Sequence, residues 1–150
     1  LNLPMDEFKD LAIKQLKHGE SVWFGSDVVQ YSETKLGIMA LNAYDYNALF
    51  DMDLDMTKAD ALDYGQSMMD HAMVLTGVDI VDGKPTKWKV ENSWGNKVGH
   101  KGYFVMSDDW MDKYCYQIVI NKKYLSDKQR KAQAQDPIVL KPWDPMGTLA

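Results

Sequence analysis

A run of strand-like segments that begins at His71 is the feature that most constrains how this chain folds. Four short segments rich in β-branched and aromatic residues follow one another in the second half of the sequence, at 72–78, 88–92, 102–106 and 116–120. Turn-forming residues, Asp82-Gly83 among them, separate the first two segments. Short apolar segments joined by tight turns are typical of antiparallel strands. We therefore expect residues 70–125 to form an antiparallel sheet or barrel.

The first 70 residues show the longer spacing that favours helices. Residues 5–17 repeat apolar side chains at roughly helical intervals, with acidic residues early and a lysine late. Residues 21–24 have the composition of a short buried strand. Residues 36–49 fit either a second helix or an irregular aromatic segment, and 57–68 fits a helix capped by Thr57. Helices early and a sheet late place the chain in the α+β class.

The sequence after the last expected strand is polar and then punctuated by proline. Pro137, Pro142 and Pro145 favour an extended segment over a further helix or strand. Between the third and fourth strands, residues 107–110 fit a short capped helix. No internal repeat or low-complexity run interrupts this order, so the pattern favours one domain.

Composition argues against several classes of partner. The chain is 45% hydrophobic and 26% charged, as globular proteins are, and its net charge is −5. A negative charge without a basic cluster gives no attraction for nucleic acid or an anionic membrane. No run of about 18 apolar residues is present, so we expect no membrane span. Cys115 is the one cysteine, and a single thiol cannot form an internal disulfide, so we expect a cytoplasmic protein.

Metal, phosphate and serine-nucleophile sites all fit the sequence poorly. The aspartates of 51–55 alternate as in a calcium loop, but Met56 and Leu62 stand where that loop needs Gly and Glu. The three histidines and one cysteine show no zinc-ligand spacing. The glycines of 95–102 follow no phosphate-binding pattern, and there is no G-x-S-x-G motif. We therefore expect no metal and no cofactor.

His71 and Asn92 are the residues that carry recognisable chemistry. His71 begins one expected strand in the sequence Asp-His-Ala-Met-Val-Leu-Thr-Gly-Val, and Asn92 ends the next in Trp-Lys-Val-Glu-Asn-Ser-Trp-Gly. Gly99, Gly102 and Tyr103 then lead into a third strand. These residues resemble the papain-like cysteine proteases, whose motifs are D-H-A-x-x-x-x-G-V, W-x-x-x-N-S-W-G and G-x-x-G-Y. Two long motifs in the right order make the resemblance specific.

Three further features are similar to one group of that clan, bleomycin hydrolase and bacterial aminopeptidase C. They are the segment 22–28, the long insert 32–69 and the ending 144–150. The resemblance implies a papain-like fold, of which this chain is the C-terminal β-barrel-like half with a helical insertion. It divides the chain into a helix and strand (1–31), a helical insert (32–69), a β-rich catalytic core (70–125) and a C-terminal arm (126–150).

The resemblance also implies roles for particular residues. His71 would pair with a cysteine as imidazolium and thiolate, and would later protonate the leaving amine. Asn92 would accept a hydrogen bond from the other ring nitrogen and so fix the ring. Trp94 would cover this contact, although a plain core tryptophan is the alternative. In the same group the C-terminal arm lies in the cleft, so the carboxylate of Ala150 would bind the free amino group of a substrate.

The expected nucleophile is missing from this sequence. The family order is cysteine, histidine, asparagine, whereas Cys115 follows both His71 and Asn92 at the start of an apolar strand. A buried structural thiol is the better interpretation. Together with Leu1 in place of an initiator methionine, this predicts that an N-terminal portion of the same enzyme carries the cysteine. The leading hypothesis is a cysteine aminopeptidase that acts on peptides and forms a homo-oligomer, a hexamer in the resembling group. The alternatives are an inactive fragment or interaction module, or a papain-type endopeptidase.

Overall fold

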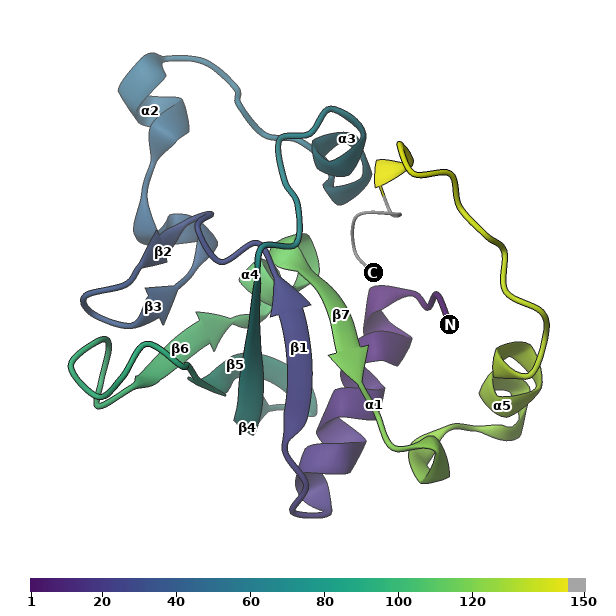
Figure 1. Cartoon of the computed structure of the whole chain (residues 1–150). Helices are drawn as coiled ribbons and strands as arrows, with labels where there is room; N and C mark the ends of the chain where they lie inside the picture. The colour runs from purple at the N-terminus through teal and green to yellow at the C-terminus, as the bar shows by residue number, and fades with distance from the viewer. Residues whose placement is uncertain (146–150) are drawn as a thin grey trace.

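Seven strands form one curled sheet in this structure, a computed structural model that describes residues 1–145 (Figure 1). In chain order the elements are α1 (Met5–Lys17), β1 (Val22–Ser26), β2 (Ser32–Glu33), β3 (Ile38–Met39), η1 (Leu41–Ala43), α2 (Tyr46–Phe50), α3 (Lys58–Asp63), β4 (His71–Val81), β5 (Lys84–Glu91), β6 (Tyr103–Ser107), α4 (Asp108–Tyr114), β7 (Cys115–Val119), η2 (Lys122–Tyr124) and α5 (Asp127–Gln133). The α+β class expected from the sequence is confirmed.

The sheet has the strand order β2-β3-β6-β5-β4-β1-β7, and only the pairing of β3 with β6 is parallel among its described strands. β4 and β5 form the longest hairpin, which turns at Asp82 and Gly83 with φ angles of 50° and 78°. Two left-handed residues give a turn whose twist matches that of the flanking strands. The antiparallel sheet expected over 70–125 is therefore confirmed. β1, from the first part of the chain, completes it between β4 and β7.

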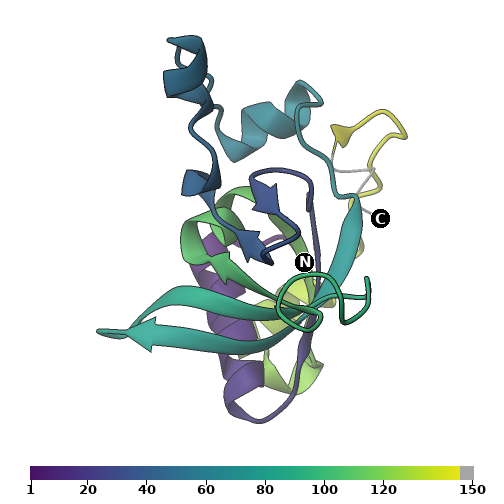
Figure 2. The ribbon, with the colours of Figure 1, turned by 90° about the vertical axis from the view of Figure 1, so that its left-hand side faces the viewer.

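The core lies between one face of the sheet and the helices α1 and α4 (Figures 1 and 2). Alternate residues of the strands point into it, and the largest buried side chains there are Phe24, Trp88, Phe104 and Trp110. The helix expected at 5–17 is confirmed to the residue. The ammonium group of Lys9 on α1 lies 2.7 Å from Asp108 and 2.8 Å from Asp112 of α4, so an ion-pair cluster ties the two helices together.

The insert 32–69 differs from the helical segment expected from the sequence. Of the two alternatives for residues 36–49, a second helix or an irregular segment, the single helix is wrong: β3 pairs with β6, and only Tyr46–Phe50 is α-helical. Thr57 caps α3 as expected, accepting a hydrogen bond from the backbone N–H of Asp60. That helix ends at Asp63, before the expected limit of 68, as the chain turns at Gly65 with φ of +67°. The insert thus carries two strands as well as short helices.

Two segments after residue 106 are more helical than the sequence suggested. The short helix expected at 107–110 continues through Tyr114, and its buried face packs on the sheet. α5 was not expected, yet Ser126 and Gln129 form a capping box at its start. Residues 136–141, which follow, contain no helix or strand, in line with the proline pattern. Across residues 1–145, no helix is both long and apolar enough to cross a membrane.

Candidate active site

His71 and Asn92 come together because β4 begins where β5 ends, at the same end of two neighbouring antiparallel strands. His71 Nε2 lies 2.9 Å from Asn92 Oδ1. The same oxygen accepts the backbone N–H of Ser93 at 2.8 Å, so it is the acceptor of both hydrogen bonds. Nε2 of His71 therefore carries the proton that it donates to Asn92. This leaves Nδ1 as the ring nitrogen for exchange with a reacting group.

Trp94 packs against the His71 ring. The two ring centroids are 4.8 Å apart, and the rings are inclined by 31°. On its other side Trp94 meets Phe104 edge-on, with centroids 5.9 Å apart. Trp94 is 40% exposed, so it is not a plain core tryptophan. The Nδ2 atom of Asn92 is buried and has no hydrogen-bond partner among residues 1–145.

The start of β4 is fixed to the end of β1 by backbone and side-chain bonds. Ser26 pairs with His71 in the β1–β4 register, and its carbonyl oxygen accepts the N–H of Asp70 at 3.1 Å. The carboxylate of Asp70 accepts the N–H of Val28 at 2.8 Å. Asp70, the residue before the histidine in the motif, thus secures the backbone on which His71 stands.

The glycine-rich loop after Asn92 is a tight turn that closes this end of the sheet. The N–H of Asn92 donates to the Gly102 carbonyl oxygen at 3.0 Å. Gly99 has φ of +61°, and a Cβ atom there would lie 2.6 Å from the carbonyl oxygen of Tyr103. Only glycine fits that position. Gly99 and Gly102 therefore form a turn between strands, which was the expectation for these glycines from the sequence.

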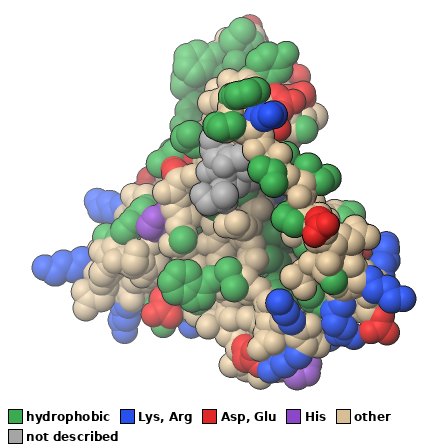
Figure 3. All heavy atoms as spheres, turned by 45° about the vertical axis from the view of Figure 1, so that its right-hand side comes forward, with side chains coloured by type: hydrophobic (Ala, Val, Ile, Leu, Met, Phe, Trp, Pro, Cys, Tyr) green, Lys and Arg blue, Asp and Glu red, His purple; other side chains and the backbone are tan. Residues whose placement is uncertain are grey.

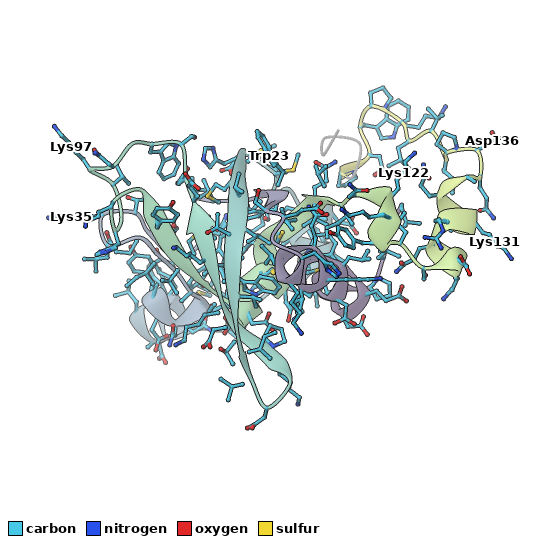
Figure 4. The ribbon with its side chains drawn as sticks, turned by 90° about the horizontal axis from the view of Figure 1, so that it is seen from below. Trp23, Lys35, Lys97, Lys122, Lys131 and Asp136 are labelled. Atoms are coloured by element: carbon cyan, nitrogen blue, oxygen red, sulfur yellow. The ribbon has the colours of Figure 1, made fainter. Side chains whose placement is uncertain are left out.

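A cavity of about 320 Å³ opens beside His71 on the sheet face that α1 does not cover. Its lining is mostly apolar and includes Phe24, Gly25, Met69, Ala72 and Val119. Trp23, which is labelled in Figure 4, forms another part of its wall and is 60% exposed. This volume lies at the lower end of the range for small-molecule pockets. Residues 21–24 were expected to form a short buried strand, so nothing in that largely apolar segment marked Trp23 as an exposed residue of a cavity wall.

Cys115 lies away from this site, in the protein core. It is fully buried on β7, and burial raises the pKa of its thiol to about 12. β1 lies between β7 and β4, and Ser26 pairs with both Cys115 and His71. Two strand spacings place the backbones of Cys115 and His71 about 10 Å apart. Cys115 is therefore neither ionised at neutral pH nor within reach of His71.

The other residues considered from the sequence are Ala150 and the possible metal ligands. Ala150 lies outside the described residues. Within residues 1–145, no three His, Cys, Asp or Glu side chains form a cluster suited to a metal. In the acidic loop 51–55, the Asp53 carboxylate accepts the backbone N–H of Asp55. The Asp55 carboxylate lies 3.7 Å from the ammonium group of Lys113.

Comparison with known proteins gives a consistent result. The chain matches the Peptidase C1-like family over residues 1–147. It is 63% identical to aminopeptidase C of Lactobacillus helveticus and 62% identical to that of Streptococcus thermophilus, in each case over 100% of this chain and 34% of the relative. A crystal structure of PepW from Lactobacillus rhamnosis HN001 is 65% identical, with a TM-score of 0.94 over 98% of this chain and 34% of that one.

The chain therefore spans about one third of the length of these relatives, and it matches their C-terminal part. The match covers the histidine and asparagine motifs as well as the insert and β7. It confirms the resemblance inferred from the motifs: the chain belongs to the Peptidase C1-like family.

Proposed function

We propose that this chain supplies the histidine and asparagine of a cysteine aminopeptidase, whose nucleophilic cysteine lies in an N-terminal portion of the same enzyme. The observation that carries the proposal is the 2.9 Å contact between His71 Nε2 and Asn92 Oδ1, which leaves Nδ1 as the proton-exchanging nitrogen. The relatives named aminopeptidase C support the reaction class. The buried, weakly acidic thiol of Cys115 supports a nucleophile elsewhere.

The chemistry follows from this arrangement. A cysteine thiolate beside Nδ1 forms an ion pair with the imidazolium of His71. The thiolate adds to the peptide carbonyl carbon, and the imidazolium gives its Nδ1 proton to the leaving amine as the C–N bond breaks. His71 then takes a proton from water as the resulting hydroxide adds to the thioester carbon. The C–S bond breaks, which releases the acid and restores the thiolate beside the His71 imidazolium. Asn92 holds the ring through Nε2 in every step.

The surroundings of the pair support further roles. Trp94, whose ring centroid lies 4.8 Å from that of His71, shields the hydrogen bond to Asn92 from water. The cavity beside His71 receives a substrate side chain. We assign recognition of the free amino group to the carboxylate of Ala150. Deleting Gly147 to Ala150 from the full-length enzyme should then allow N-blocked peptides to be cleaved. Unchanged rejection of blocked peptides would remove that assignment.

The proposal includes a cytoplasmic homo-oligomer, a hexamer as in the resembling group. Exposed apolar side chains support a protein contact. They gather on α2 and the segment after it, which stands away from the sheet (Figures 2 and 3). Leu49, Phe50 and Met52 are the most exposed of them. Patches of this kind on a projecting segment mark interfaces. Light scattering of the full-length enzyme should give several times the mass of one chain, whereas a monomer would contradict this part.

Hydrolysis of an amino-acid anilide by the full-length enzyme tests the proposal. His71→Ala should abolish turnover, while Cys115→Ala should leave it unchanged because that thiol is remote from the site. An N-blocked peptide serves as the second substrate, since its cleavage would favour the papain-type endopeptidase. A full-length enzyme without thiol-dependent turnover would favour the inactive interaction module. Full activity of His71→Ala would contradict the proposal directly.

A further inference from the structure

The segment 67–70, which leads from α3 into β4, contains no helix or strand of its own (Figure 1). Its backbone therefore lacks the regular hydrogen bonds that hold a strand in place. Yet its last residue is followed directly by His71. Whatever fixes this segment also fixes where the imidazole ring can lie.

The side chain of Asp27, just after β1, holds the start of this segment. Asp27 Oδ2 accepts the hydroxyl of Ser67 at 2.7 Å and the backbone N–H of Met68 at 3.3 Å. Asp27 is only 2% exposed, and Ser67 is 3% exposed. A carboxylate removed from water at this depth is costly unless it accepts hydrogen bonds. Its presence here therefore calls for a role that an apolar side chain could not fill.

Both partners of this contact are themselves anchored. The N–H of Asp27 donates to the carbonyl oxygen of Tyr114 at 3.0 Å, which ties it to the end of α4. The hydroxyl groups of Ser67 and Tyr116 lie 2.5 Å apart, which ties the segment to β7. Asp27 thus stands at the centre of a buried network that joins β1, the segment and β7.

The segment has little room to move toward the sheet. The sulfur atom of Met69 lies 2.1 Å from where a Cβ atom on Gly25 would stand, so Met69 fills the space that this glycine leaves. Met69 also lines the cavity beside His71. Displacement of the segment would therefore move the cavity wall and the histidine together.

We propose that Asp27 is a positioning residue for the peptidase reaction, which holds segment 67–70 so that the His71 ring meets both Asn92 and the cysteine. This inference rests on the proposed function. The acceptor oxygen of Asp27 is the operative group, since both donors meet the same atom. A misplacement of the ring by about 1 Å is enough to cost roughly a hundredfold in rate.

The test compares three variants of the full-length enzyme at a temperature well below unfolding. Asp27→Ala removes the acceptor, and kcat should fall by about 10- to 100-fold. Asp27→Asn keeps an acceptor oxygen and should recover most of that loss. Lys9→Met is the matched stability control, because it breaks the contacts between α1 and α4 without touching the segment.

A second readout separates positioning from stability. The pH at which the active-site thiol becomes reactive toward iodoacetamide reports its pairing with the His71 imidazolium. This midpoint should rise in Asp27→Ala and stay at the wild-type value in Lys9→Met. If Asp27→Ala does not fold, Ser67→Ala removes one of the two donors and should raise the midpoint by a smaller amount.

Three results would overturn the inference. They are a wild-type kcat and midpoint in Asp27→Ala, an Asp27→Asn enzyme as impaired as Asp27→Ala, or an equal loss of kcat in Lys9→Met at the same fall in Tm. Failure of the proposed function looks different. In that case the wild-type enzyme shows no thiol-dependent turnover, or His71→Ala retains it, whatever the Asp27 variants do.

Discussion

Asn92→Ala removes the side-chain oxygen that accepts the Nε2–H of the His71 ring. Asn92 Oδ1 accepts the Nε2–H of His71 at 2.9 Å, and in the mechanism that we propose this donor belongs to an imidazolium. A hydrogen bond to a charged group contributes about 1.5–3 kcal/mol. Because about 1.4 kcal/mol corresponds to a tenfold change in rate, kcat/KM should fall by roughly 10- to 150-fold. Activity should remain measurable, since Nδ1 can still exchange a proton with the thiol.

Initial rates on an amino-acid anilide measure this effect in the full-length enzyme. Thr86→Ala is a matched control on the same strand. It removes an exposed hydrogen bond to Asp79 near the other end of β5, so kcat/KM should be unchanged. The reasoning would be refuted if Asn92→Ala kept wild-type kcat/KM. It would also be refuted if Thr86→Ala lost as much, since the effect would then belong to the strand and not to the histidine.

Three further outcomes are expected. Cys115 should resist alkylation in the native enzyme and react only after unfolding, because burial raises its thiol pKa to about 12. Alkylation of Cys115 in the native enzyme as fast as that of a small free thiol would be inconsistent with this. Burial also raises the pKa of Asp27, so the folded state binds more protons there, and stability is lost as pH rises from the ordinary carboxyl value through the raised one. Denaturant melts give the difference in unfolding free energy between Asp27→Asn and wild type, and this difference should favour the variant more at neutral pH than in mild acid. An equal difference at the two pH values would contradict the raised pKa. Ser126→Ala should destabilise α5 by about 1 kcal/mol, seen as faster amide hydrogen exchange in 127–133, and unchanged exchange would deny the capping box its role.

The strands and α1 could be predicted from the sequence because their signal is local. Residues 5–17 repeat apolar side chains at helical spacing, and Asp82-Gly83 is a turn by its own chemistry. β3 shows the opposite case. It is two residues long and exists because it pairs with β6, more than sixty positions later in the chain. A strand made by a distant partner leaves no periodicity to detect.

Some residues of the site could likewise be predicted from the sequence, and others could not. The motifs around His71 and Asn92 predicted which residues meet, and the hydrogen bond between their side chains agrees with that expectation. Asp27 could not be recognised, since its partners Ser67 and Met68 lie forty positions away on a segment without regular structure. The sequence shows an aspartate after a strand, and only the fold shows that it is buried beside the segment leading to the histidine.

Mapping the most reactive cysteine of the full-length enzyme tests the central claim most directly. Limiting iodoacetamide is added at neutral pH, and the labelled peptide is identified by mass spectrometry. The label should appear on a cysteine outside these 150 residues, at a rate that falls sharply in His71→Ala. Labelling of Cys115, or labelling that is unaffected by His71→Ala, would contradict the assignment of the histidine–asparagine half of the site to this chain.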